Sequence, residues 1–161
     1  MMKFICPLIT VTDIKRSRIF YENVLNQKVA FDFGQNVSFA GGFAIHLRSH
    51  YKELIGNKEI RPGGNDFELY FEFDDLESFV AKLLENQVIF VHQMREQPWK
   101  QRVVRFYDPD EHIVEVGESM EYLSYRLSKE GMTAEEIAVA TGLLADFIKG
   151  AVESFSKANN E

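Results

Sequence analysis

The sequence contains few of the features that mark secreted, membrane-spanning or nucleic-acid-binding proteins. Its 161 residues include one cysteine, Cys6, which excludes an internal disulfide and suits a reducing compartment, so we expect a cytoplasmic protein. No run approaches the ~20 apolar residues that span a bilayer, and the first apolar segment is short and broken by Pro7. The net charge of −7 disfavours contact with phosphate backbones. We therefore expect a small-molecule ligand, and no nucleic-acid or membrane partner.

What is present is a pattern that occurs twice. Val11-Thr12-Asp13-Ile14 and Phe73-Asp74-Asp75-Leu76 each follow an apolar, strand-like run and open a helical stretch, and an Asn-Gln pair follows each helix. Each half ends on an alternating run, at residues 43–48 and 112–117. The repeat predicts an α+β fold of two β-α-β-β-β modules around a shared cleft.

The modules are expected at residues 1–48 and 66–118, joined by a polar linker at 49–65 that contains Pro62-Gly63-Gly64-Asn65. Asp13 is expected to cap the first helix, and the second helix shows an amphipathic stripe from Leu76 to Leu84. Residues 93–101 are expected to be irregular. Strands are expected at 4–11, 29–33, 37–40, 43–48, 67–74, 88–91, 102–107 and 112–117.

Residues 119–161 form a separate C-terminal extension rich in helix formers, with helices expected at 121–129, 134–141 and 144–157. Thr133 as a cap and Gly142 as a turn are typical of the first half of a helix-turn-helix. The following helix begins with an acid and carries a single base nearby, which disfavours DNA. We expect these helices to pack on the modules or on a second subunit.

Four residues occupy related positions in the repeat. Cys6 and Glu68 lie at equal distances before the helix starts at Asp13 and Asp75. His46 and Glu115 lie in the middle of the last strand of each half. Because side chains alternate along a strand, these polar side chains are expected on the sheet face opposite the apolar ones. Histidine, thiolate and carboxylate together suit zinc, nickel, iron or manganese. Taken alone, Cys6 is more often a small core residue and His46 more often a hydrogen-bonded structural residue.

The closing segment carries a resemblance to a known family. Gln97-Pro98-Trp99 and the run from Arg102 to Val116, with Asp108-Pro109-Asp110 before a strand that contains Glu115, resemble the vicinal oxygen chelate superfamily, as does Tyr21-Glu22-Asn23-Val24-Leu25. That superfamily includes glyoxalase I, extradiol dioxygenases and bleomycin-resistance proteins. The resemblance implies curved mixed sheets in a partial barrel, metal ligands from the first and last strands of each module, and a homodimer.

The chain departs from the family pattern at several of these positions. Cys6 stands where a histidine is usual, Glu68 where one is frequent, and His46 where glyoxalase-type members carry glutamate. The set is therefore either a permuted metal site or the lining of a metal-free pocket. Further pocket residues are expected to be Tyr70, Glu72, Trp99, Arg102 and Arg105, the two arginines lying on opposite faces of their strand. His50, His92 and His112 are expected to be surface or loop residues.

Two functions follow, with a weaker third. The first is a glyoxalase-like lyase or isomerase of unknown substrate, in which His46, Cys6, Glu68 and Glu115 hold a divalent metal and Glu115 or Glu68 takes part in catalysis. The second is a metal-free protein that binds or sequesters a small cationic compound in an acidic, aromatic cleft. The third is a regulator whose C-terminal helices contact a protein partner.

Overall fold

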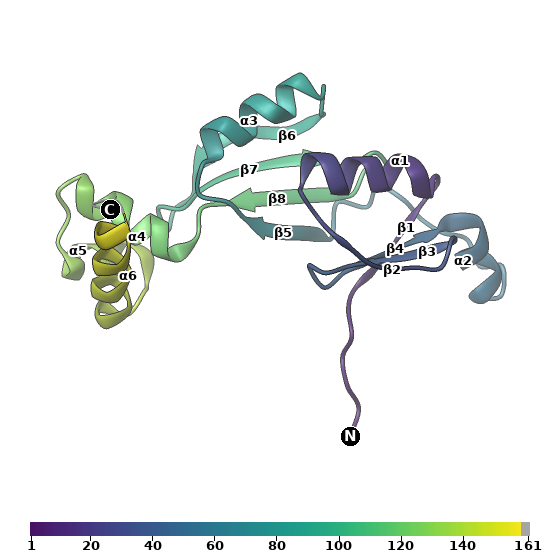
Figure 1. Cartoon of the computed structure of the whole chain (residues 1–161), viewed down its shortest axis with the longest axis horizontal. Coiled ribbons are helices and arrows are strands. Elements are labelled where there is room, and N and C mark those ends of the chain that lie inside the picture. Colours follow the sequence, from purple (N-terminus) through teal and green to yellow (C-terminus); the bar gives the residue numbers. More distant parts are fainter. Residues whose placement is uncertain (159–161) are drawn as a thin grey trace. The chain divides into compact units, whose positions relative to one another are not determined.

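The internal repeat is present as two β-α-β-β-β modules, and the α+β class is confirmed (Figure 1). The computed structural model describes residues 1–158. The chain divides into two compact units. The first consists of residues 1–68, 86–89 and 107–113, and the second of residues 69–85, 90–106 and 114–161.

The first module forms a four-stranded mixed sheet in the order β1-β4-β3-β2. β1 runs parallel to β4, whereas β3 is antiparallel to both β2 and β4. Asp13 caps α1 as expected, accepting a hydrogen bond from the Arg16 backbone N–H at 3.0 Å. The elements are β1 (Leu8–Val11), α1 (Ile14–Ile19), the π-helical turn η1 (Phe20–Val24), β2 (Val29–Asp32), β3 (Asn36–Phe39) and β4 (Ala44–Leu47).

Two expectations for this module are wrong. β1 begins at Leu8, because the chain before it pairs with the sheet only through the Pro7 carbonyl, which accepts from the Ala44 N–H at 3.0 Å. The expected linker begins with a helix, α2 (Arg48–Leu54), which follows β4 directly. None of the α2 residues is fully buried, so the helix has no apolar stripe by which the sequence could reveal it.

The second module forms a four-stranded sheet in the order β5-β8-β7-β6, and α3 covers one of its faces (Figure 1). The predicted stripe is confirmed: Leu76, Phe79 and Leu83 are buried, and the rings of Phe79 and Phe106 lie 5.9 Å apart. The segment expected to be irregular begins as strand, since β6 continues to Glu96, and is irregular from Gln97 to Gln101 as expected. The elements are β5 (Glu68–Glu72), α3 (Leu76–Glu85), β6 (Phe90–Glu96), β7 (Arg102–Tyr107) and β8 (Ile113–Gly117).

The C-terminal extension consists of α4 (Met120–Lys129), α5 (Ala134–Thr141) and α6 (Ala145–Ala158), close to the expected bounds. The helices share their own apolar cluster of Leu123, Leu127, Ile137 and Ile148. Thr133 and Glu136 form a capping box, and Gly142 ends α5 with a φ of 77°.

A buried carboxylate links this bundle to the second sheet. Glu118 is fully buried and accepts hydrogen bonds from Arg102 of β7 at 2.5 Å and from Arg126 of α4 at 2.9 Å. Arg126 also donates to the Lys100 carbonyl at 2.7 Å. Two guanidinium groups thus compensate one desolvated charge and fix where α4 begins.

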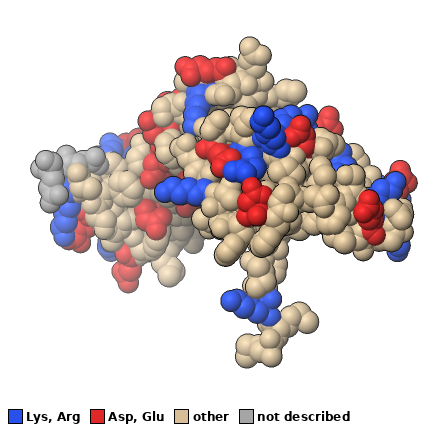
Figure 2. Space-filling model, turned by 45° about the vertical axis from the view of Figure 1, so that its right-hand side comes forward, with Lys and Arg blue, Asp and Glu red and all other residues tan. Residues whose placement is uncertain are grey.

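Within residues 1–158, no helix has the length and apolar character required to cross a membrane. Figure 2 shows acidic and basic side chains interspersed on the face in view.

Candidate functional site

His46 lies in a cluster of aromatic and amide side chains in the first unit. The sheet register places Asn36 of β3 opposite His46, and the Asn36 Nδ2 lies 3.0 Å from the His46 Nδ1. α2 begins two residues later and returns His50 and Tyr51 over the same ring. The His46 Nε2 lies 2.8 Å from the His50 Nδ1, and the Tyr51 ring meets His46 edge-on at 5.8 Å. His46 is consequently only 7% exposed.

This environment favours a neutral His46 imidazole. Burial, together with the neighbouring His50, lowers the pKa of His46 below its ordinary value. With the Asn36 amide donating to Nδ1, the proton of His46 resides on Nε2 and is donated to His50. His50, which was expected to be a surface or loop residue, lies in α2 and is half-buried.

In the second unit, Glu115 of β8 is buried and forms an ion pair with Arg105 of β7. Arg105 also donates through Nη1 to the His92 Nε2 on β6, at 3.3 Å. The three side chains thus lie in a row across one face of the sheet. The guanidinium neutralises the carboxylate where it would otherwise be desolvated without compensation.

A second polar row on this module contains Tyr70, Glu72, Trp99 and Gln101. The Tyr70 hydroxyl donates to Glu72 at 2.9 Å and accepts from the Gln101 amide at 2.8 Å, while the Trp99 Nε1 donates to the Gln101 oxygen at 3.0 Å. Partial burial and the Glu72 carboxylate raise the pKa of Tyr70 to about 12, against the opposing effect of Gln101. Tyr70 is therefore a hydrogen-bond donor at neutral pH.

The remaining predicted residues are Cys6, Glu68 and Arg102. Cys6 is half-buried in the segment before β1, and Glu68 is exposed at the start of β5. Arg102 binds Glu118 and, through Nη1, Glu77 at 2.7 Å. The two arginines do point in different directions, but each meets a carboxylate.

The predicted donor set does not fit a metal centre. Glu115, its best-matched member, is paired with Arg105, so its carboxylate is neutralised by a competing cation. Cys6 lies outside the strands, and no group of three or more His, Cys, Asp or Glu residues within residues 1–158 is arranged to hold a metal ion. No reaction step is therefore assigned to a metal held by these four residues.

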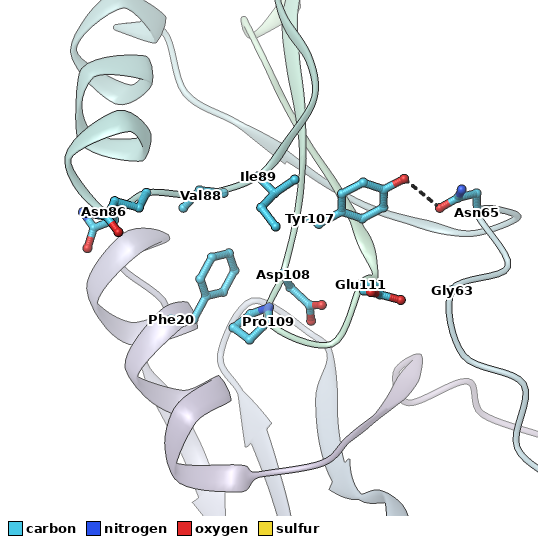
Figure 3. A pocket seen from close by; sticks show the side chains of 11 residues that line it. Phe20, Gly63, Asn65, Asn86, Val88, Ile89, Tyr107, Asp108, Pro109 and Glu111 are labelled. Atoms are coloured by element: carbon cyan, nitrogen blue, oxygen red, sulfur yellow. Dashed lines mark hydrogen bonds between the residues drawn. The ribbon is translucent and has the colours of Figure 1, made fainter.

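The first unit contains a cavity of about 560 Å³, within the range of small-molecule sites (Figure 3). The apolar lining comes from Phe20, Val88, Ile89 and Pro109, and Figure 3 shows the Phe20 ring below the Val88 and Ile89 side chains. The polar lining consists of Asn65, Asn86, Gln87, Tyr107, Asp108 and Glu111, with the backbone of Gly63 completing it.

The cavity is acidic. Of the described residues that line it, two are carboxylates and none is lysine or arginine. Asp108 is buried and accepts hydrogen bonds from the Tyr21 hydroxyl at 2.7 Å and from the His112 backbone and ring nitrogens at 2.8 Å each. Glu111 is exposed, and at the rim the Tyr107 hydroxyl donates to the Asn65 oxygen at 3.1 Å.

None of the residues predicted to form the site lines this cavity. Its floor comes from the turn at residues 108–111 and from the Asn-Gln pair after α3, which were recognised in the sequence only as a turn and as part of the repeat. The signal available was composition: Tyr107, Asp108 and Glu111 place an aromatic ring and two acids within five positions. His112 lies in the loop immediately before β8, as expected, and its ring nitrogen binds the buried Asp108.

Comparison with known proteins places the modules in a family. The glyoxalase-like domain family matches residues 4–121. A protein of unknown function from Agrobacterium tumefaciens str. C58 is 40% identical, with a TM-score of 0.68 over 74% of this chain and 96% of that chain. No curated protein sequence matches the chain.

Two more distant structures share the fold. A glyoxalase/bleomycin resistance protein/dioxygenase from Nocardioides is 17% identical, with a TM-score of 0.58 over 73% of this chain and 84% of that chain. Lactoylglutathione lyase from Agrobacterium tumefaciens is 20% identical, with a TM-score of 0.56 over 74% of this chain and 96% of that chain. The family match ends at residue 121, so it leaves almost all of α4–α6 outside.

Proposed function

Because the chain belongs to the glyoxalase-like domain family of the vicinal oxygen chelate superfamily, we propose that it binds a small cationic compound in the acidic cavity of its first unit. This is the binding or sequestering function of the bleomycin-resistance type, rather than a metal-dependent lyase or isomerase. The observation that carries the proposal is the cavity itself, which combines an apolar wall with carboxylates and lacks a basic residue among its described lining.

The charge and shape of the cavity favour an amphipathic cation. Phe20 and Tyr107 contribute aromatic rings to the lining, which suit an ammonium group, and the exposed Glu111 carboxylate supplies the charge that attracts it. Val88 and Ile89 suit the apolar part of such a ligand. Asp108 is already satisfied by Tyr21 and His112, so its role is to hold the turn in place.

The alternative enzyme function is disfavoured by the chemistry of its donors. In that hypothesis Glu115 binds a metal and His46 completes the site. Glu115 instead pairs with Arg105, and His46 lies under α2 with Asn36 and His50 as partners. A ligand-binding function requires neither residue to be released from these contacts.

A charge series tests the proposal. We expect 2-phenylethylamine to bind the full chain, neutral 2-phenylethanol to bind more weakly, and anionic 3-phenylpropionate not to bind, as measured by ligand-observed NMR. Glu111→Gln should weaken amine binding about fivefold, the equivalent of about 1 kcal/mol for an exposed ion pair, and leave the alcohol unchanged. Val88→Trp should weaken both, because the indole occupies the cavity.

Glu85→Gln is the matched control, since Glu85 is an exposed acid on α3 that does not line the cavity. Equal binding of the amine and the carboxylate would contradict the proposal, as would an amine affinity that Glu111→Gln leaves unchanged. Elemental analysis of untagged protein addresses the alternative: a stoichiometric metal that is lost in Glu115→Gln would favour the metalloenzyme.

A further inference from the structure

The His46–His50 pair has a geometry that the proposed ligand-binding function does not use. The two imidazole rings are nearly parallel, at 24°, with centroids 5.0 Å apart, and their facing nitrogens are separated by 2.8 Å. His46 is buried and His50 is half-buried, so His50 forms the solvent side of the pair. We propose that His46 and His50 bind one first-row transition ion, such as Zn²⁺, Ni²⁺ or Cu²⁺, in place of their shared hydrogen bond.

The nitrogen spacing supports this directly. Two imidazole nitrogens that each lie about 2.0–2.1 Å from a metal ion are about 2.9 Å apart at the right angle of Ni²⁺ and Cu²⁺ sites, and about 3.3 Å apart in the tetrahedral geometry of Zn²⁺. The His46 Nε2 and His50 Nδ1 are 2.8 Å apart. An ion can therefore take the place of the bridging proton when the two rings tilt so that both lone pairs face it.

The surroundings orient the inner ligand. Asn36 contacts the Nδ1 of His46, the nitrogen that does not face His50. In the structure the Asn36 amide nitrogen donates to Nδ1, so ion binding requires the amide to rotate and present its oxygen. The oxygen then holds the proton on Nδ1, which leaves the Nε2 lone pair for the ion. The Tyr51 ring packs edge-on against the His46 ring and restricts its rotation. The remaining coordination positions go to water.

The ligand chemistry selects the class of ion. Neutral imidazoles bind Zn²⁺, Ni²⁺ and Cu²⁺, whereas Mg²⁺ and Ca²⁺ prefer oxygen donors. The pair retains His46 from the set predicted by sequence, but its partner comes from the next element of the same module rather than from Glu115.

The test uses the full chain without a histidine tag, titrated with Ni²⁺ or Zn²⁺ alone by isothermal calorimetry. We expect one ion to bind per chain. His50→Gln, which keeps a polar partner for His46, should weaken this binding by at least about tenfold, and His46→Gln should do the same. His92→Gln is the matched control, because His92 belongs to the second unit and should leave the affinity unchanged.

Circular dichroism confirms that each variant is folded, so that a lost site is not mistaken for a lost fold. The proposal is overturned if the wild type binds no ion beyond the level of the His46→Gln/His50→Gln double variant. It is also overturned if His92→Gln weakens binding as much as His50→Gln. Since the titration contains metal alone, its outcome is independent of whether the cavity binds an amine.

Discussion

The last strands of the two modules bury a polar residue at the same position and stabilise it differently. His46 in β4 is 7% exposed and Glu115 in β8 is 4% exposed. His46 is held by uncharged partners, Asn36 and His50, and by the edge of a ring. Glu115 is held by the charge of Arg105.

The difference shows that duplication preserved the geometry of the sheet but not the chemistry on its face. A buried imidazole can be neutral, so several weak contacts are enough to offset the cost of removing it from water. A buried carboxylate requires a compensating charge, so its stability depends on one neighbour. The two sites should therefore respond unequally to the loss of a partner.

The largest effect is expected from Arg105→Met, which leaves Glu115 buried without its counter-ion. Breaking a buried pair costs about 3–5 kcal/mol of unfolding free energy. Urea unfolding of the full chain measures it, with Arg95→Met, an exposed arginine on β6, as control. The Arg105→Met/Glu115→Met double variant should recover much of the loss. A cost below about 1 kcal/mol for Arg105→Met would mean that the pair is not buried as described.

A smaller effect is expected from Asn36→Ala, which removes one neutral partner of His46. Leaving a buried nitrogen without its hydrogen bond costs about 1–2 kcal/mol. The same urea experiment measures it, and the exposed Asn23→Ala should change stability by less than about 0.5 kcal/mol. If Asn36→Ala proved as costly as Arg105→Met, the contrast between the two sites would be lost.

The pH dependence separates the sites further. The pKa of His46 is lower in the folded protein than in the unfolded chain, where it is about 6.5, so the unfolded chain binds the proton more readily. The contribution of His46 to the free energy of unfolding is therefore complete above about pH 6.5, and it is lost as the pH falls towards the pKa of the folded state. Unfolding curves between about pH 7.5 and 5.5 should show this slope, and His46→Gln should reduce it. An unchanged slope in the variant would assign the effect to another group.

The smallest effect concerns Tyr70, whose phenol is partly exposed. Its pKa of about 12 lies above the ordinary value, so its contribution to stability is present below about pH 10 and is lost as the pH rises towards 12. Absorbance at the wavelength of tyrosinate should show a late transition that is absent in Tyr70→Phe, whereas the buried Tyr21, whose pKa is also raised by burial and by Asp108, is unaffected by the substitution. A Tyr70 transition near pH 10 would indicate that the Glu72 and Gln101 contacts do not persist in solution.

The modules were predictable because their signals are local. Helix α3 is recognisable from the spacing of Leu76, Phe79 and Leu83, and the start of α1 from the capping residue Asp13. Helix α2 is not predictable from the sequence because it has no buried apolar face. Its residues can be assigned to a helix only when the end of β4 at Leu47 is known.

The site was less predictable because it depends on pairing between strands. Alternation placed Arg102 and Arg105 on opposite faces, but only the arrangement of β7 and β8 shows that Arg105 meets Glu115 and Arg102 meets Glu118. His50 carried a signal that was overlooked, since it stands four positions after His46. That spacing brings side chains together only because a helix begins between them.

The Glu118 contacts with Arg102 and Arg126 have a consequence for how the second unit opens. A local fluctuation that detaches α4 from β7 exposes one carboxylate and two guanidinium groups at once, so partial fraying at this junction is unfavourable. Amide protons at the start of α4 should then exchange with deuterium as slowly as those of β7, while those of α5, which lacks such a link, exchange sooner.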